Sequence, residues 1–279
     1  SDGASLYSTT DLATLVMRMK ENNPDRVIYL ADARQSMHFI QVFRCARKTG
    51  IVPDTTELVH IGFGTMNGKD GKPFKTRDGG VMRLEYLLKE IDDEMLNKIK
   101  ENQKEKENLN IDEAEAKQTA KTVALAAVKY GDLSNQASKD YIFDIDRFTS
   151  FEGNTGPYIL YTIVRIKSIL SKYEAKGGDI SALKDAIMPA VNAGQKNLML
   201  SLAKFNATIE SAYEESAPHK ICAYIYELAN AFNGFYHDTK ILSEENEELK
   251  KSYISLLVLT KEILEACIDM LGFSAPDRM

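Results

Sequence analysis

Lysine and glycine residues are concentrated between His60 and Arg77. The segment contains four glycines, and within nine positions it places four cations: Lys69, Lys72, Lys75 and Arg77. Because a lysine ammonium group is a compact charge that can follow a leaving group, such a loop suits the charge that develops on a polyphosphate. A basic surface loop has the same composition and stays an alternative. A P-loop is rejected, since the glycine spacing is one residue short and Asp70 replaces the metal-binding hydroxyl.

A phenol, a carboxylate and an amide occur near the start of the chain. Tyr7 lies four residues before Asp11 at a predicted helix start, and Gln35 follows the first predicted strand. At the carboxyl end of a parallel strand, these groups could together receive a planar cation with several donors, such as guanidinium. Asp11 or Thr10 could instead serve only as a helix cap.

Four aromatic residues surround the glycine-rich segment 153–157. They are Phe148, Phe151, Tyr158 and Tyr161. Exposed aromatic rings beside a helix start can form a platform on which splayed bases stack. Aromatic residues packed in a hydrophobic core explain the same cluster and are the commoner case.

The elements that position these residues differ along the chain. Residues 26–31 and 58–63 are short apolar runs, and the first predicts a strand buried on both faces of a parallel sheet. Residues 35–48 between them have a helical pattern that ends before Gly50. The alternation predicts an open α/β layer. From Arg83 onward the hydrophobic period becomes helical, and the polar residues 97–112 predict a solvated helix end followed by a connector.

Composition excludes several classes of protein. With 279 residues, 44% of them hydrophobic, the chain can bury a large core and is neither collagen-like nor a small disulfide-rich domain. Its formal charge of −6 disfavours extensive wrapping of nucleic acid. Three cysteines lie in apolar helical patterns and are predicted to be buried, without a disulfide or zinc spacing. The sequence shows no membrane span or secretory signal, so we expect a soluble, cytoplasmic protein.

Five segments, taken in order, resemble the carboxyl-terminal half of arginyl-tRNA synthetase. They are residues 2–13, 31–35, 68–77, 151–158 and 277–279. The resemblance runs essentially from end to end. It implies an α/β part followed by an all-α part: the second half of a class I Rossmann catalytic domain with its connector helix over residues 1–110, and a helical bundle anticodon-binding domain over residues 111–279.

The resemblance also assigns roles to residues. Tyr7, Asp11 and Gln35 correspond to the arginine side-chain pocket, and His38 and Met66 to the adenosine pocket. Residues 72–76 correspond to the Lys-Met-Ser-Lys-Ser loop of the class in a degenerate form. Lys72 and Lys75 are then expected to act in catalysis by stabilising the departing pyrophosphate. In the helical part, Tyr158, Tyr161 and Met279 correspond to anticodon-binding positions, with Arg165 and Lys167 as nearby basic side chains.

The implied activity is ATP-dependent activation of arginine and its transfer to tRNA(Arg), with Mg²⁺ accompanying ATP and no protein-bound metal. The upstream His-Ile-Gly-His segment of class I enzymes does not occur, because the fourth residue of 60–63 is Phe63. We therefore expect a fragment of a longer enzyme that is inactive by itself, and a monomer. A non-catalytic tRNA-binding or assembly module is the alternative.

Overall fold

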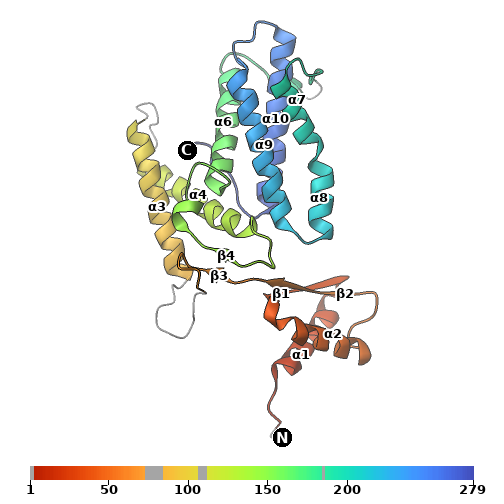
Figure 1. Cartoon of the computed structure of the whole chain (residues 1–279). Coiled ribbons are helices and arrows are strands. Elements are labelled where there is room, and N and C mark those ends of the chain that lie inside the picture. Colours follow the sequence, from red (N-terminus) through yellow and green to blue (C-terminus); the bar gives the residue numbers. More distant parts are fainter. Residues whose placement is uncertain (1–2, 73–83, 106–111, 184–185) are drawn as a thin grey trace. The chain divides into compact units, whose positions relative to one another are not determined.

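The computed structural model describes residues 3–72, 84–105, 112–183 and 186–279 (Figure 1). Two compact units are formed. One comprises residues 1–73 together with 137–142, and the other comprises residues 74–136 together with 143–279. The predicted domain boundary at residue 110 is a different division, taken from the resemblance to the family, and it stays a prediction.

The first unit is built on a strand–helix–strand arrangement preceded by a helix. Its elements are α1 (Tyr7–Glu21), β1 (Arg26–Asp32), the 3-10 helix η1 (Ala33–Gln35), α2 (Ser36–Lys48) and β2 (Glu57–Phe63). β1 and β2 pair in parallel, with Val27 opposite Leu58. Parallel strands need a crossover connection, and α2 supplies it. The predicted α/β layer is confirmed.

Buried apolar side chains join the helices of this unit to β1. The cluster contains Leu15 of α1, Val27 of β1, Val42 and Ala46 of α2, and Val52. Each of these side chains is at most 5% exposed. Their burial fixes the faces of α1 and α2 and thereby the direction of the polar residues at the helix starts.

The opposite face of β1 is open, so the prediction of a strand buried on both faces was wrong. Ile28 and Leu30 alternate with Val27 and Tyr29 and are 47% and 67% exposed. Successive side chains of a strand point to opposite faces. Within the described residues the sheet has two strands and its helices cover one face, so the apolar run of β1 exceeds what this unit buries.

A short second sheet continues the chain after β2. It pairs β3 (Met66–Asn67) in parallel with β4 (Tyr141–Ile142). The backbone N–H of Gly64 donates to the carbonyl of Ala137 over 2.8 Å, and that of Thr65 donates to Asp140 Oδ1 over 2.6 Å. These bonds fix the path of the chain between β2 and Met66.

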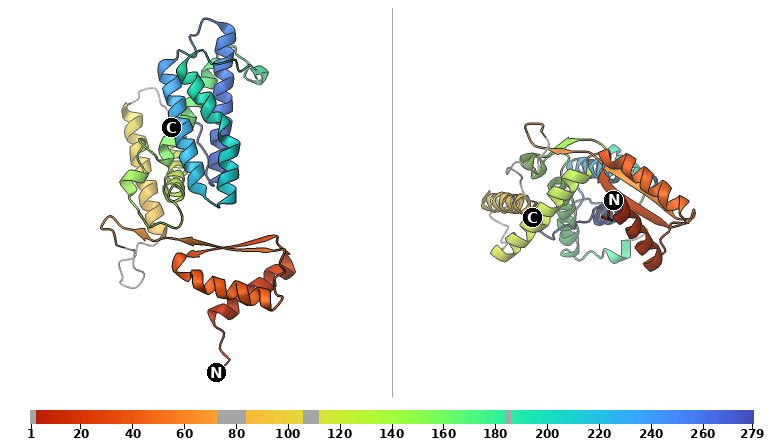
Figure 2. Two further views of the ribbon diagram at one scale, coloured as in Figure 1. Left: turned by 45° about the vertical axis from the view of Figure 1, so that its right-hand side comes forward. Right: turned by 90° about the horizontal axis from the view of Figure 1, so that it is seen from below.

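The second unit is a helical bundle (Figures 1 and 2), which confirms the predicted all-α part. Its elements are α3 (Leu84–Glu105), α4 (Glu113–Leu133), α5 (Ile145–Phe148), α6 (Gly156–Glu174), η2 (Ser181–Leu183), α7 (Ala193–Ala203), α8 (Phe205–Glu214), α9 (Pro218–Asp238) and α10 (Glu247–Met270). Asp112, Thr155, Asn192 and Asn246 cap the starts of α4, α6, α7 and α10 with side-chain oxygens.

The core of the bundle brings α4, α6, α9 and α10 together. Fully buried side chains include Ile159 and Ile163 of α6, Phe232 of α9 and Leu264 of α10. α6 begins directly against α4, because a Cβ on Gly156 would overlap the carbonyl group of Ala126. This close approach fixes the start of α6, which carries the predicted anticodon residues.

The cysteine prediction holds for two of the three residues. Cys222 and Cys267 are fully buried, and burial raises the pKa of each thiol to about 12. Cys45 is exposed, so its predicted burial was wrong: α2 turns this position away from the Val42 and Ala46 side. Among the described helices, none combines the length and apolar character that a bilayer span requires.

Candidate functional site

The carboxylate of Asp11 contacts the imidazole of His38. Asp11 lies on α1, one turn after Tyr7, and His38 lies in the first turns of α2. The Oδ2 of Asp11 is 2.6 Å from the Nε2 of His38, and both side chains are half-buried. The structure thus joins one residue predicted for the arginine pocket to one predicted for the adenosine pocket.

The other two predicted arginine-binding residues are exposed. Tyr7 is 88% exposed at the start of α1, and Gln35 is exposed at the end of η1. In the part of the chain that the structure describes, no side-chain hydrogen bond joins Tyr7, Asp11 and Gln35 to one another. The hydroxyl of Tyr7 and the amide of Gln35 are available to a ligand, whereas one carboxylate oxygen of Asp11 is already bound to His38.

An acidic–basic pair shapes the turn that carries Gln35. The backbone and side chain of Arg34 both donate to Asp32 at the end of β1, with Nη2 2.6 Å from Oδ2 and the backbone N 2.8 Å from Oδ1. The side-chain hydrogen bonds from Arg34 lower the pKa of Asp32 to about 2. Sequence reasoning quoted both residues but missed this role, although their spacing of two is typical of a local turn.

Tyr29 connects β1 to the Asp11 region. The guanidinium carbon of Arg18 lies 5.1 Å from the centre of the Tyr29 ring, which also packs on Phe39 at 4.9 Å. Burial raises the pKa of the Tyr29 phenol, while the charge of Arg18 acts in the opposite direction. Phe39 in turn stacks on His60, with ring centres 4.7 Å apart.

Met66 and Lys72 lie on the segment after β2. Met66 is half-buried in β3, opposite Tyr141. Lys72 ends a tight turn in which its carbonyl accepts from the backbone of Gly68 over 3.0 Å, and its side chain is exposed. Gly71 adopts φ +72°, a conformation that favours glycine at this point of the turn. Lys75 lies outside the described residues.

In the second unit, the hydroxyl of Tyr158 is held between two amides of α9. It donates to Asn230 Oδ1 over 2.6 Å and accepts from Asn233 Nδ2 over 2.9 Å. The ring of Tyr226 meets the Tyr158 ring edge-on at 5.8 Å. Because the hydroxyl group is engaged on both sides, the ring is the part of Tyr158 that can meet a ligand.

Arg165 lies between two aromatic rings. Its guanidinium carbon is 4.8 Å from the centre of Tyr161 and 5.4 Å from that of Tyr236, and its Nη1 donates to Asn233 Oδ1 over 2.6 Å. Tyr158, Tyr161, Arg165, Asn230, Asn233 and Tyr236 are called the α6–α9 cluster below. Planar groups and amides of this kind stack on bases and bond their edges.

Sequence reasoning missed the α9 members of this cluster. Asn230, Asn233 and Tyr236 recur at intervals of three along a helix whose other residues are mostly apolar. That interval places side chains on one face of a helix. The signal was present in the sequence, but only the fold shows that this face meets Tyr158 and Arg165.

The last predicted residue, Met279, is half-buried at the end of the chain. Its neighbour Arg278 forms an ion pair with Glu115 on α4. Lys167, predicted as a basic contact, already pairs with Glu265 and Asp277 at 3.3 and 3.2 Å.

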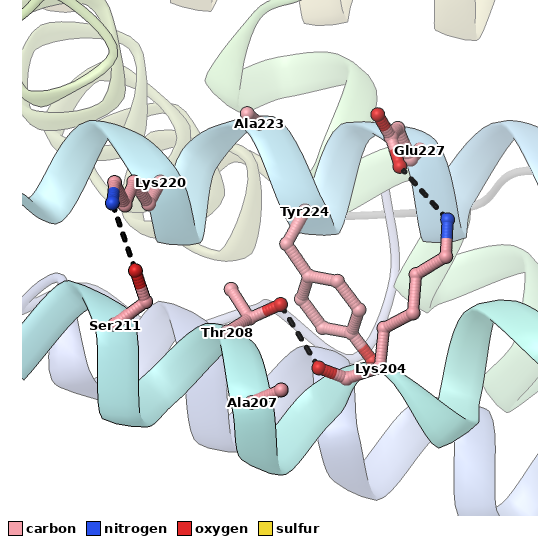
Figure 3. Close-up of a pocket in the computed structure, with 8 residues that line it drawn as sticks. All are labelled: Lys204, Ala207, Thr208, Ser211, Lys220, Ala223, Tyr224 and Glu227. Atoms are coloured by element: carbon pink, nitrogen blue, oxygen red, sulfur yellow. Dashed lines mark hydrogen bonds and ion pairs between the residues drawn. The ribbon is translucent and has the colours of Figure 1, made fainter.

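A separate groove of about 420 Å³ lies between α8 and α9 (Figure 3). The view shows the Tyr224 ring passing between the two helices. Both lysines of the groove are paired: Lys204 lies 3.7 Å from Glu227, and Lys220 contacts Glu215. No residue of the α6–α9 cluster lines it.

Comparison with known proteins finds one family model for each of two parts of the chain. The family described as tRNA synthetases class I (R), catalytic domain, matches residues 1–145, and the DALR anticodon binding domain matches residues 159–279. An arginine–tRNA ligase from Alkaliphilus oremlandii is 55% identical over 279 residues, and one from Francisella tularensis is 44% identical over 280. In both cases all of this chain is covered, but only 46% of the relative.

Solved structures give the same result. An arginyl-tRNA synthetase from Plasmodium falciparum superimposes on the whole chain with a TM-score of 0.82 and 28% identity, covering 46% of that protein. One from Thermus thermophilus has a TM-score of 0.81 at 23% identity, covering 50% of that protein, which supports the fold. The chain therefore belongs to the arginyl-tRNA synthetase family of class I and spans about half the length of the relatives it matches.

Proposed function

We propose that this chain is the carboxyl-terminal part of an arginine–tRNA ligase. It binds the anticodon of tRNA(Arg) through the α6–α9 cluster and contributes one side of the site that activates arginine. The observation that carries the proposal is the cluster itself, which α6 and α9 assemble from aromatic rings, two amides and a guanidinium, almost all within the anticodon-binding match to residues 159–279.

In the activation step, the arginine carboxylate attacks the α-phosphate of ATP, and pyrophosphate leaves as arginyl-adenylate forms. Asp11 and the hydroxyl of Tyr7 accept hydrogen bonds from the arginine guanidinium, with Gln35 as a further acceptor. A lysine substrate would leave some of these acceptors unpaired, which disfavours it. His38 holds the Asp11 carboxylate in place.

The remaining groups of this part act on the nucleotide. Met66 and His38 face the adenosine, and Lys72 and Lys75 neutralise charge on the departing pyrophosphate, assisted by Mg²⁺ bound to ATP. The exposed end of the Lys72 side chain supports this role, because it can reach a phosphate group. The monomeric state and the cytoplasmic location stay predictions from the sequence.

For tRNA binding, the rings of Tyr158 and Tyr161 stack on bases, and Met279 contacts the same nucleotides. The chain carries a formal charge of −6, so attraction to phosphates is local rather than general. We therefore expect selectivity to come mainly from base contacts.

The test is binding of an anticodon stem-loop of tRNA(Arg) to the 279-residue chain, compared with the same stem-loop carrying a changed central anticodon base. Base–aromatic stacking contributes about 1–3 kcal/mol per base, so Tyr161→Ala should weaken cognate binding roughly 5- to 150-fold. Tyr213→Ala is the matched control, because this tyrosine is 73% exposed on α8. Equal binding of both stem-loops by the unmodified chain would refute the anticodon assignment.

Activation is tested separately by arginine-dependent exchange between ATP and pyrophosphate. The chain alone should show none, whereas a protein that also contains the upstream half of the family fold should show it. Loss of that activity on Lys72→Ala together with Lys75→Ala, with retained stem-loop binding, supports the two separate roles. Unchanged exchange in this variant would refute the assignment of the lysines.

A further inference from the structure

The segment that follows α10 is attached to the bundle at its first residues. Leu271 and Phe273 are buried, at 4% and 5% exposure. Between them, the carbonyl of Gly272 accepts from Lys129 Nζ of α4 over 2.5 Å, and Gly272 adopts φ +80°. The chain reverses here, so the residues after Phe273 leave the core.

Residues 274–279 are then held by charged side chains of two different helices. The guanidinium of Arg278 meets the carboxylate of Glu115 on α4 with both prongs, at 3.1 Å for Nε–Oε1 and 3.1 Å for Nη2–Oε2. Lys167 of α6 lies 3.2 Å from Asp277 Oδ1 and 3.4 Å from the carbonyl of Pro276. Two neighbouring residues of the tail are thus tied to α4 and to α6.

The ion pairs that attach the tail to the bundle are individually weak. Asp277 is 95% exposed and Arg278 60% exposed, and exposed ion pairs each contribute little. Ordering the tail costs backbone entropy at every residue. The two-pronged geometry of Arg278 with Glu115 is the strongest of these contacts, so closure of the tail depends on it.

The tail contacts α6, the helix that also carries Tyr161, at Lys167. Successive residues of an α-helix are rotated by about 100°, so Lys167 lies about 120° around α6 from Tyr161. Arg165 lies about 40° from Tyr161 in the direction of α9, where Asn233 binds it. The strip of α6 that carries Tyr161 therefore lies, in the order of positions around the helix, between the contact with α9 and the contact with the tail.

We propose that residues 274–279 form a C-terminal latch, which the Arg278–Glu115 pair closes and which places Met279 at the edge of the Tyr161 strip. Its effect on RNA rests on the proposed anticodon binding. The flexible, polarizable Met279 side chain adapts its shape to a base, and holding its backbone removes part of the ordering cost at binding. Glu115 and Arg278 are positioning residues, since they act through Met279.

Closure of the latch can be measured without RNA. Glu115→Gln removes the negative charge and one of the two acceptor oxygens that Arg278 binds, and it leaves the tail sequence unchanged. Release of Met279 by a carboxypeptidase should become about three- to tenfold faster. The matched control is Glu113→Gln on the same turn of α4, since Glu113 pairs locally with Lys117 at 3.0 Å. Equal release rates in Glu115→Gln and the unmodified chain would overturn the latch.

The same variants then test the role of the latch in RNA binding. Glu115→Gln should weaken binding of the arginine anticodon stem-loop about three- to tenfold, and Glu113→Gln should not. The exchanged pair Glu115→Arg with Arg278→Glu should recover both slow release and tight binding. Faster release with unchanged stem-loop affinity would overturn the placement of Met279.

A failure of the proposed function gives a different result. In that case the unmodified chain would not distinguish the two stem-loops, and the contact of Met279 with RNA would fail with it. The release assay would still decide whether the latch exists, because it contains no RNA.

Discussion

The hydroxyl of Tyr130 on α4 lies 2.8 Å from the carbonyl oxygen of Cys222 on α9 and 2.5 Å from Asn154 Oδ1. Tyr130 is fully buried, and burial raises the pKa of its phenol strongly. The contact joins α4 to α9, the helix that carries Asn230 and Asn233 of the α6–α9 cluster.

This contact predicts that Tyr130→Phe is destabilising. The variant removes the side-chain hydrogen bond to the buried Cys222 carbonyl, and such a bond contributes about 0.5–1.5 kcal/mol. Tyr224 is the matched comparison, since it is 4% exposed and its hydroxyl has no hydrogen-bond partner among the described residues. Tyr224→Phe should therefore be neutral or stabilising. Chemical denaturation of both variants measures this, and equal losses of unfolding free energy would contradict it.

The Asp32–Arg34 pair predicts a pH dependence for the turn that carries Gln35. The folded pKa of Asp32 is about 2, below the ordinary 3.8. A depressed carboxyl pKa gives stabilisation that is fully present above the unfolded pKa and is lost as the pH falls through the folded value. We expect the turn to hold at neutral pH and to loosen as the pH falls from about 4 toward 2.

The carboxyl ¹³C shift of Asp32 measures this pKa directly. Arg34→Gln should raise the titration midpoint from about 2 toward 3.8, because the side-chain hydrogen bonds of Arg34 are the largest cause of the shift, while the backbone N–H of residue 34 still donates to Asp32. Arg44→Gln, which changes an exposed arginine on α2, is the control. A midpoint that stays near 2 in Arg34→Gln would show that another group lowers the pKa.

The Asp11–His38 contact predicts that His38, which is assigned to the adenosine pocket, also affects the binding of arginine. In the longer enzyme, His38→Ala should raise the KM for arginine about tenfold or more, since a hydrogen bond to a charged group contributes about 1.5–3 kcal/mol. Pyrophosphate exchange at varied arginine and ATP measures both constants. Cys45→Ala, on the exposed side of α2, should change neither. A rise in the KM for ATP alone would leave His38 as a nucleotide contact only.

Local patterns predicted much of the fold. The strands at 26–32 and 57–63 lie within one residue of the apolar runs that predicted them, and the helical period predicted from Arg83 onward begins with α3 at Leu84. The open face of β1 could not be predicted. An apolar run shows that a strand can be buried on both faces, but it does not show which elements cover those faces. Leu30 at 67% exposure is the clearest case.

The candidate sites, like the fold, could be predicted only in part from the sequence. Tyr158 and Tyr161 could be selected from one segment, but Asn230 and Asn233, which bind the hydroxyl of Tyr158, lie 72 and 75 residues later. Contacts over such separations depend on how α6 and α9 pack, which a single sequence does not state. The Arg278–Glu115 pair spans 163 positions and was invisible for the same reason.

The geometry of Arg165 predicts that its shape matters more than its charge. Arg165→Lys retains the positive charge but loses the planar group that lies against Tyr161 and Tyr236. Cation–π contacts contribute about 0.5–2 kcal/mol, so binding of the cognate stem-loop should weaken roughly 2- to 30-fold.

The salt dependence separates the two contributions of Arg165. Binding through phosphates gives a slope of affinity against salt that reflects the number of neutralised charges. Arg165→Lys should leave this slope unchanged while selectivity for the arginine anticodon falls. The exposed Arg147 on α5 provides the control Arg147→Lys, for which neither quantity should change. A reduced slope without loss of selectivity in Arg165→Lys would assign Arg165 to a phosphate rather than to a base.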